Sequence, residues 1–330
     1  MEKIATPVVD MLWEDEDPQS VIQSRFGFED AEQAGNWIKE TVQTQWELDI
    51  RSCDRIVISD RNALGWLHAP SGSYVAKWSI AGDRFAHLGT LARVVAWLGK
   101  EGVPVSAPIP ASNGRVQLEI DNVSLALQEK IEGTILDVCE SSQVRAAGAT
   151  LARVHETLAA YPGSLQSPTL HPPQGTLSSL VRGWLDGDRS HVPTAALQAL
   201  EEAIDSGLDD ALPNQMLHGD FRCTNILWSG TEVSGVLDFD EARIGPRIDE
   251  LARSAVLLGT QYRDWNPVSA KVRSIFLEGY ASVSALTPAE VRWWPVLVLW
   301  YSVAMIPKHE ESSSWSRAAL EELSSSTWRA

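Results

Sequence analysis

The sequence of 330 residues predicts an α+β protein with two lobes: a small lobe around a five-stranded antiparallel sheet, and a mainly helical large lobe. Between residues 55 and 131, short segments of alternating apolar residues are separated by polar turns, which is typical of antiparallel strands. After Gly133 the apolar residues recur at helical spacing instead. A chain of this length can bury a large core and form two lobes.

The small lobe is predicted to occupy residues 1–127, and two helices accompany its sheet. The first helix is expected at Gly35–Leu48, and the second, Arg84–Lys100, is inserted between the third and fourth strands. Asp60–Asn62 and Pro70–Gly72 are polar turns between strands. The five strands are predicted at Arg55–Ser59, Leu64–His68, Ser73–Trp78, Arg115–Ile120 and Ser124–Ile131.

The large lobe is predicted to occupy residues 134–330. Its longest apolar run, Trp293–Pro307, is shorter than the roughly 20 residues that a bilayer span needs, so we expect a buried helix there. The predicted helices are Ser142–Ala159, Thr176–Leu185, Thr194–Asp205, Asp249–Leu258, Ala270–Ala285 and Pro288–Ala304.

Composition narrows the function classes. The net charge of −17 speaks against a nucleic-acid partner, because a phosphate backbone selects for Lys and Arg. The same charge could attract cationic ligands, or it could simply be the acidic surface common in some cytoplasmic proteomes. Three Cys without CxxC spacing favour a reducing compartment, and the acidic N-terminal segment does not resemble a signal peptide. We therefore expect a cytoplasmic protein without a membrane partner; the sequence predicts nothing about oligomeric state.

Three polar residues of the large lobe stand at informative spacing. Asp220 precedes Asn225 by five residues, and Asp238 follows Asn225 by thirteen. Phosphoryl transfer from ATP needs this set: a carboxylate that orients the attacking hydroxyl and accepts its proton, and oxygen ligands for Mg²⁺. Short predicted strands at 226–228 and 233–237 would form a hairpin that brings Asn225 and Asp238 together. The alternative is that Asp220 merely caps a turn.

The motifs around these residues resemble those of a known family. His218–Asn225 resembles the H-G-D-x-x-x-x-N catalytic loop of the aminoglycoside phosphotransferase and choline kinase group, small-molecule kinases related in fold to protein kinases. Asp238–Asp240 resembles its metal-binding D-x-D, and Gly245–Ala252 its G-P-x-x-x-D-L-A stretch. The resemblance implies a bilobal protein-kinase-like fold, with Asp220 as catalytic base, Asn225 and Asp238 as metal ligands, and ATP and Mg²⁺ as cofactors.

Two further residues of these motifs are expected to have structural roles. His218 carries no obvious chemistry and should hold the catalytic loop by hydrogen bonds. Asp249 should bond backbone amides or the catalytic loop without touching substrate.

Lys77 resembles the ATP-phosphate Lys of this fold, because it lies on the third strand just before the inserted helix. The alternative is an ordinary exposed strand residue. In relatives a Glu of the following helix pairs with this Lys, but the helix Arg84–Lys100 contains no carboxylate. Leu91 stands where that Glu would align, and His87 lies one turn earlier. Either His87 or a carboxylate elsewhere orients Lys77, or the pairing is absent.

The remaining nucleotide contacts are expected from position. The segment Ser59–Gly65 is no G-x-G-x-x-G loop, but Ser59 and Arg61 could contact phosphate; otherwise it is an ordinary hairpin turn. Residues 128–133 resemble the hinge between the lobes, where adenine would bond backbone groups near Glu129 and Ile131.

Acidic and aromatic residues of the large lobe could surround a cationic acceptor, or they are solvated surface residues. They are Trp184, Asp186, Asp188, Asp240, Glu241, Glu310 and Glu311. The predicted function is ATP-dependent O-phosphorylation of a small molecule, foremost an aminoglycoside-like or other antibiotic. A metabolic acceptor (homoserine, an amino alcohol or a sugar) is the alternative. A catalytically weak nucleotide-binding regulator is a further alternative, supported by the missing helix Glu.

Overall fold

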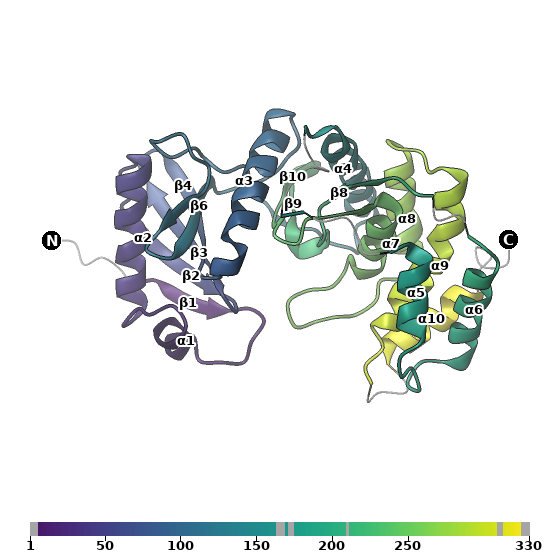
Figure 1. Ribbon diagram of the computed structural model, residues 1–330. Coiled ribbons are helices and arrows are strands. Elements are labelled where there is room, and N and C mark those ends of the chain that lie inside the picture. Colours follow the sequence, from purple (N-terminus) through teal and green to yellow (C-terminus); the bar gives the residue numbers. More distant parts are fainter. Residues whose placement is uncertain (1–5, 163–168, 171–174, 209–210, 309–312, 325–330) are drawn as a thin grey trace. The chain divides into compact units, whose positions relative to one another are not determined.

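The computed structural model describes residues 6–162, 169–170, 175–208, 211–308 and 313–324. The chain divides into two compact units, residues 1–132 and 133–330, which are described one at a time below (Figure 1). The predicted hinge, residues 128–133, spans the boundary between these units.

A six-stranded sheet forms the small unit, in the order β1-β2-β3-β4-β6-β5. The five strands β2 to β6 pair antiparallel, as predicted. An additional strand, β1, pairs in parallel with β2 and was not predicted. The bounds are β1 Val8–Met11, β2 Ser52–Ile58, β3 Asn62–Ala69, β4 Gly72–Ser79, β5 Leu118–Ile120 and β6 Val123–Glu129.

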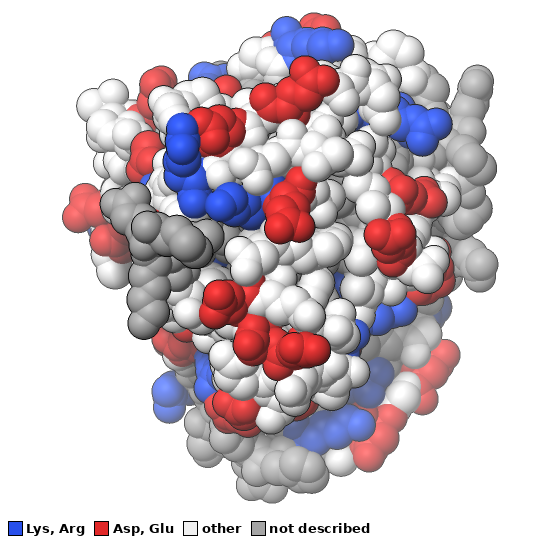
Figure 2. All heavy atoms as spheres, turned by 90° about the vertical axis from the view of Figure 1, so that its left-hand side faces the viewer, with Lys and Arg blue, Asp and Glu red and all other residues white. Residues whose placement is uncertain are grey.

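Helices lie on both sides of this sheet (Figure 1). They are α1 Pro18–Ser24, α2 Ala31–Trp46 and α3 Phe85–Lys100. Ile38 and Val42 of α2 pack in one core cluster with Ala76 and Trp78 of β4. Because successive side chains of a strand point to opposite faces, Lys77 lies on the face away from α2. On the side that α2 covers, acidic side chains are spread out with basic ones between them, and that side shows no continuous basic surface among the described residues (Figure 2).

Seven helices are described in the large unit: α4 Ser141–Ala160, α5 Leu177–Leu185, α6 Thr194–Asp205, α7 Arg247–Leu257, α8 Ala270–Ala281, α9 Pro288–Ala304 and α10 Ser314–Ser324. Six of them confirm predicted helices, and α10 is additional. The helices α4 and α8 cross closely, since a Cβ at Gly148 would lie 2.0 Å from the carbonyl oxygen of Phe276. Within the described ranges, none of the helices combines the length and apolarity needed to cross a bilayer.

Two short sheets of the large unit carry the motif residues. The strands are β7 Thr134–Ile135, β8 Asn214–Leu217, β9 Ile226–Ser229, β10 Glu232–Val236 and β11 Arg243–Pro246. One sheet has the order β10-β9-β7, and the other pairs β11 with β8. The catalytic-loop motif begins at the end of β8 and runs into β9, while the D-x-D motif connects β10 to β11.

Candidate active site

The β9–β10 hairpin brings Asn225 and Asp238 together, as the sequence predicted. Ile226 pairs with Val236, and the amide of Leu237 donates a hydrogen bond to the carbonyl of Asn225 at 2.8 Å. Asp238 follows directly, with an exposed side chain and a left-handed backbone (φ 60°). Aspartate tolerates this conformation better than most residues, and it turns the chain sharply after β10.

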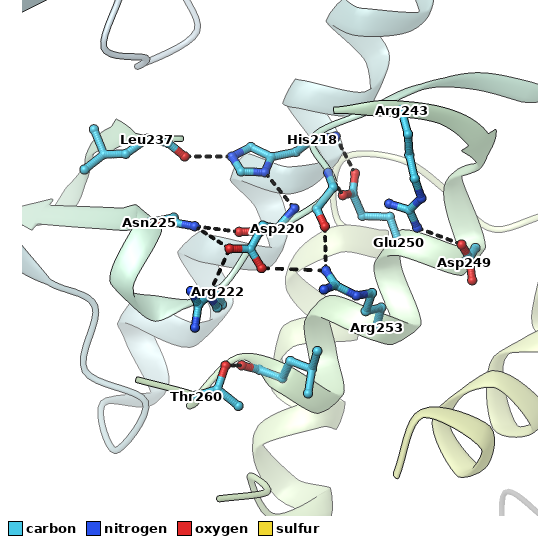
Figure 3. A network of polar contacts seen from close by, with 12 residues as sticks. His218, Asp220, Arg222, Asn225, Leu237, Arg243, Asp249, Glu250, Arg253 and Thr260 are labelled. Carbon is cyan, nitrogen blue, oxygen red and sulfur yellow. Dashed lines mark hydrogen bonds and ion pairs between the residues drawn. The ribbon is translucent and has the colours of Figure 1, made fainter. Parts of the chain in front are cut away.

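Asp220 is held by hydrogen bonds within its own loop (Figure 3). Its Oδ2 accepts from Asn225 Nδ2 and from Arg222 Nε, each at 3.0 Å. Asn225 Nδ2 also donates to the Asp220 carbonyl at 2.9 Å. The Asp220 side chain remains 20% exposed, so a reactant hydroxyl can reach it. Asp220 thus combines a fixed orientation with access from outside, which a general base requires.

The oxygen donors of the site fit a hard divalent cation. Because Asn225 Nδ2 faces Asp220, the amide oxygen of Asn225 is turned away from Asp220, and the backbone of Asn225 bonds the residue directly before Asp238. Amide and carboxylate oxygens suit Mg²⁺, which usually takes one or two carboxylates and completes its shell with water and phosphate oxygens. In the described part of the chain, no group of three His, Cys, Asp or Glu forms a complete metal cage.

His218 has the structural role that the sequence predicted. The ring is fully buried; Nε2 donates to the Leu237 carbonyl at 2.9 Å and Nδ1 accepts from the Asp220 amide at 3.1 Å. Burial lowers the pKa of His218, so the ring stays neutral with its proton on Nε2. His218 therefore ties the catalytic loop to the segment that carries Asp238, and Phe239 packs beside it with ring centroids 4.3 Å apart.

Only glycine fits between His218 and Asp220. Gly219 has φ 92°, and a Cβ there would lie 1.9 Å from the carbonyl oxygen of Glu241. The catalytic loop therefore runs directly against the segment after the D-x-D motif.

The role predicted for Asp249 was wrong, and Glu250 fills it instead. Asp249 accepts hydrogen bonds from Arg243 Nη2 at 2.8 Å and from the Tyr301 hydroxyl at 2.6 Å. Glu250 accepts from the amides of His218, at 2.8 Å, and Gly219. The sequence motif contained the signal for this role. In G-P-x-x-x-D-L-A the acidic residue stands directly before Leu-Ala, and Glu250 occupies that position in this chain.

Glu250 is ionised although it is buried. Its Oε2 also accepts from His155 Nε2 of α4 at 2.8 Å, and both side chains are 1% exposed. Burial alone would raise the pKa of Glu250, but the hydrogen bond and charge of His155 and the charge of Arg243 lower the pKa to about 2. His155 Nδ1 in turn bonds the Tyr280 hydroxyl of α8 at 2.9 Å. This buried chain anchors the catalytic loop to α4, α7 and α8.

Two arginines beside Asp220 were not predicted from the sequence. Arg222, two residues after Asp220, has a side chain only 8% exposed, and its guanidinium lies 5.6 Å from the ring centroid of Trp265. Arg253 Nη1 donates to the Gly219 carbonyl and lies 3.8 Å from Asp220 Oδ1. The position of Arg222 inside the catalytic-loop motif was the available signal.

The predicted small-lobe residues have the following surroundings. Lys77 is half-buried in β4, opposite Leu64 and Ala126 on the neighbouring strands. Leu91 is a buried apolar residue of α3, 3% exposed, and His87 is half-buried. The roles of Lys77 and His87 toward a nucleotide stay predictions.

Ser59 and Arg61 lie in the turn that joins β2 to β3. The amide and hydroxyl of Ser59 both donate to the Asn62 carbonyl, at 2.8 and 3.3 Å. Arg61 Nη1 pairs with Asp83 at 2.8 Å, and its Nε lies 3.7 Å from Asp60. Exposed ion pairs of this kind are weak, so phosphate could displace them; that contact stays a prediction.

The two predicted adenine contacts lie at the end of the small unit. Glu129 is the last residue of β6, opposite Tyr74, and the next amide, of Lys130, donates to the Ser73 carbonyl at 2.9 Å. Ile131 is half-buried. Their adenine contacts stay predictions.

Two of the predicted acceptor-binding residues, Asp240 and Glu241, lie beside the catalytic loop, because Gly219 approaches the backbone of Glu241 closely. Trp184 belongs to α5, which packs on α6, and the guanidinium of Arg189 lies 4.4 Å from its ring centroid. A cation of the protein therefore already covers one face of this ring.

Four other acidic acceptor candidates lie near α5 or outside the described residues. Asp186 is exposed at the end of α5. Asp188 accepts from the Ser190 amide at 3.1 Å, and hydrogen bonds from Ser190 lower the pKa of Asp188. Glu310 and Glu311 lie outside the described residues.

Comparison with known proteins finds a family match and similar relatives. The family model of the Phosphotransferase enzyme family matches residues 62–294, more than half of the chain. Homoserine kinase of Neisseria meningitidis serogroup B is 25% identical over 203 residues, 60% of this chain and 63% of that protein. Stress response kinase A of Salmonella typhi is 28% identical over 183 residues, 53% of this chain and 52% of that protein. The chain thus spans less than two thirds of these curated relatives.

The fold is shared with a solved small-molecule kinase. The structure of amicoumacin kinase with AMP-PNP, Ca²⁺ and Ami covers 87% of this chain and 91% of that chain, with a TM-score of 0.56 and 16% identity. This likeness confirms the predicted kinase-like fold. Together with the family match, it establishes that the chain belongs to the Phosphotransferase enzyme family.

Proposed function

We propose that this protein transfers a phosphoryl group from ATP to a hydroxyl of a small molecule, with Mg²⁺ as cofactor. The observation that carries the proposal is the arrangement of Asp220, Asn225 and Asp238: the Asn225 amide group fixes the Asp220 carboxylate, and the hairpin holds Asn225 beside the segment that carries Asp238. Family membership supports the same reaction type.

Each residue has a separate task in the proposed reaction. Asp220 orients the acceptor hydroxyl and accepts its proton. Asn225 and Asp238 would hold Mg²⁺, which when bound neutralises the charge of the phosphates. Lys77 would contact the phosphates, Ser59 and Arg61 would cover them, and backbone groups of Glu129 and Ile131 would bind adenine. His218 and Glu250 hold Asp220 in position, because their hydrogen bonds fix the loop backbone on both sides of Gly219.

For the acceptor, we propose a small amine-bearing alcohol, foremost an antibiotic of the aminoglycoside type. Carboxylates at Asp240 and Glu241, beside the catalytic loop, would attract an ammonium group of such a molecule. The likeness to amicoumacin kinase supports an antibiotic acceptor. Similarity to homoserine kinase favours a second candidate, a metabolic amino alcohol, which carries the same two chemical groups.

The test is ADP release with Mg²⁺-ATP over two acceptor pools, one of aminoglycosides and amicoumacin, the other of homoserine and short amino alcohols. We expect acceptor-dependent release from one pool in the wild type and none in Asp220→Asn. Calorimetry should show ATP binding that depends on Mg²⁺. Acceptor-dependent release that persists in Asp220→Asn would refute the assignment. Binding of ATP without turnover in both pools would favour the nucleotide-binding regulator.

A further inference from the structure

Arg222 is held in a fixed position next to the catalytic carboxylate. Its Nε donates to Asp220 Oδ2 at 3.0 Å, and its guanidinium lies over the ring of Trp265, 5.6 Å from the centroid. With a carboxylate on one side and an aromatic face on the other, this planar group is well oriented. The arginine therefore holds a positive charge directly beside the carboxylate of Asp220 (Figure 3).

Orienting Asp220 does not require Arg222. Asn225 already donates to both the side chain and the carbonyl of Asp220, and the Asp220 amide bonds His218. Arg253 adds a second guanidinium 3.8 Å from the other carboxylate oxygen. Keeping a guanidinium 8% exposed costs desolvation energy. Because Asp220 is already oriented by other residues, a direct role of Arg222 in the reaction explains this cost better than one more hydrogen bond to Asp220 does.

Phosphoryl transfer offers such a role. The transferred group passes through a loose transition state with charge on its three equatorial oxygens, and cations that contact them accelerate the reaction. The acceptor oxygen forms its bond to phosphorus while it lies next to Asp220, so the phosphoryl group must pass close to Asp220 as well. Since Arg222 contacts Asp220 through Nε, its guanidinium lies close enough to the transferring group to donate to those oxygens.

We propose that Arg222 is a catalytic residue that binds the phosphoryl group during its transfer; this rests on the proposed function. The bond from phosphorus to the acceptor oxygen forms, and the bond from phosphorus to the oxygen of the leaving nucleoside diphosphate breaks. The acceptor proton goes to Asp220. Arg222 keeps its protons throughout and contributes only charge and hydrogen bonds.

The test uses Arg222→Gln and Arg222→Lys in the full chain. We expect Arg222→Gln to lower kcat by about 10²–10³-fold, the usual effect of losing one transition-state donor. The Kd for Mg²⁺-ATP should change by less than about 3-fold, because the contact forms mainly in the transition state. Arg222→Lys should recover part of kcat, since it keeps the charge without the planar group. The matched control is Arg182→Gln, at a surface arginine of α5 paired with Asp205, and it should leave kcat unchanged.

A second measurement separates a phosphoryl contact from a structural role. ADP with Mg²⁺ and aluminium fluoride mimics the transferring group, and its affinity can be measured without any acceptor. Arg222→Gln should lose most of the affinity that aluminium fluoride adds to ADP, whereas Asp220→Asn, which keeps the arginine, should retain it. Melting temperatures of all variants are measured in parallel.

Retained aluminium fluoride affinity in Arg222→Gln, or a kcat like that of the wild type, overturns the proposal. A loss of kcat that Arg222→Lys does not reduce, with a lowered melting temperature, also overturns it and assigns Arg222 to loop structure. These outcomes differ from failure of the proposed function, in which the wild type itself neither binds Mg²⁺-ADP nor phosphorylates an acceptor.

Discussion

Replacing Glu250 by Gln tests the buried anchor of the catalytic loop. The carboxylate accepts from two loop amides and from His155, while Gln has only one acceptor oxygen on its side chain. In any orientation, the new amide group faces at least one N–H donor. Losing a hydrogen bond to a charged group costs about 1.5–3 kcal/mol, and an orphaned donor adds to that. The bond count thus predicts a destabilisation of about 3 kcal/mol.

The pKa shift of Glu250 gives a second estimate. Its pKa falls from 4.5 to about 2 on folding, which at 1.36 kcal/mol for each pKa unit corresponds to about 3 kcal/mol. Because the folded-state pKa is the lower one, this stabilisation is complete above pH 4.5. It is lost as the pH falls toward 2, and about half should be gone by pH 3.

The assay is urea unfolding of wild type and Glu250→Gln at pH 7, 5, 4 and 3, together with kcat at pH 7. The difference in free energy of unfolding should be about 3 kcal/mol at pH 7 and should shrink below pH 4.5, and kcat should fall because the loop backbone moves. The matched control is Asp249→Asn, which alters the neighbouring carboxylate but no catalytic-loop bond, and it should leave kcat nearly unchanged. A difference that stays below about 0.5 kcal/mol, or that does not depend on pH, would refute the reasoning.

Four other substitutions test the site. Asp220→Asn should lower kcat about 10²–10⁴-fold while calorimetry shows near-normal ATP affinity; a normal kcat would exclude the base. Asp238→Ala should weaken ATP binding only when Mg²⁺ is present, and an unchanged metal dependence would show that it is no ligand. Lys77→Met should raise the KM for ATP, whereas wild-type kinetics would leave Lys77 an ordinary strand residue. Gly219→Ala should abolish activity, because Gly219 has φ 92° and a Cβ there would lie 1.9 Å from a carbonyl oxygen. A fully active Gly219→Ala variant whose crystal structure shows an unchanged loop would contradict this close approach.

Regular pairing made most of the small-lobe sheet predictable. Strands β3 and β4 alternate over most of their length, and the turns that join β2, β3 and β4 contain polar residues, so both signals agree. The parallel strand β1 has only four residues, and one of its anchors is an ion pair between Asp10 and Arg55, at 2.7 Å, far apart in sequence. Such a segment has too few residues to show a period, and its partner cannot be read locally.

Within the site, spacing predicted neighbours along a hairpin but not contacts between helices. Asn225 and Asp238 could be paired because a short hairpin fixes the register between them. The bond from His155 to Glu250 joins helices 95 residues apart, so only the packed structure reveals it. Trp184 shows the converse problem: its aromatic face suited a ligand cation, but Arg189, a few residues later, already lies over it. A sequence shows which side chains could bind a ligand, but tertiary packing determines which surfaces are already occupied.

The absence of a carboxylate in the helix that follows Lys77 should not affect how Asp220 is oriented. The groups that orient Asp220, namely Asn225, His218 and Glu250 through the loop, all belong to residues 133–330. Leu91, which aligns with the missing Glu, belongs to the small unit and is buried. The geometry of the base therefore does not depend on the pairing of Lys77. Variation at Lys77 should appear in the KM for ATP, whereas variation at Glu250 should appear in kcat, and the two effects should add when the changes are combined.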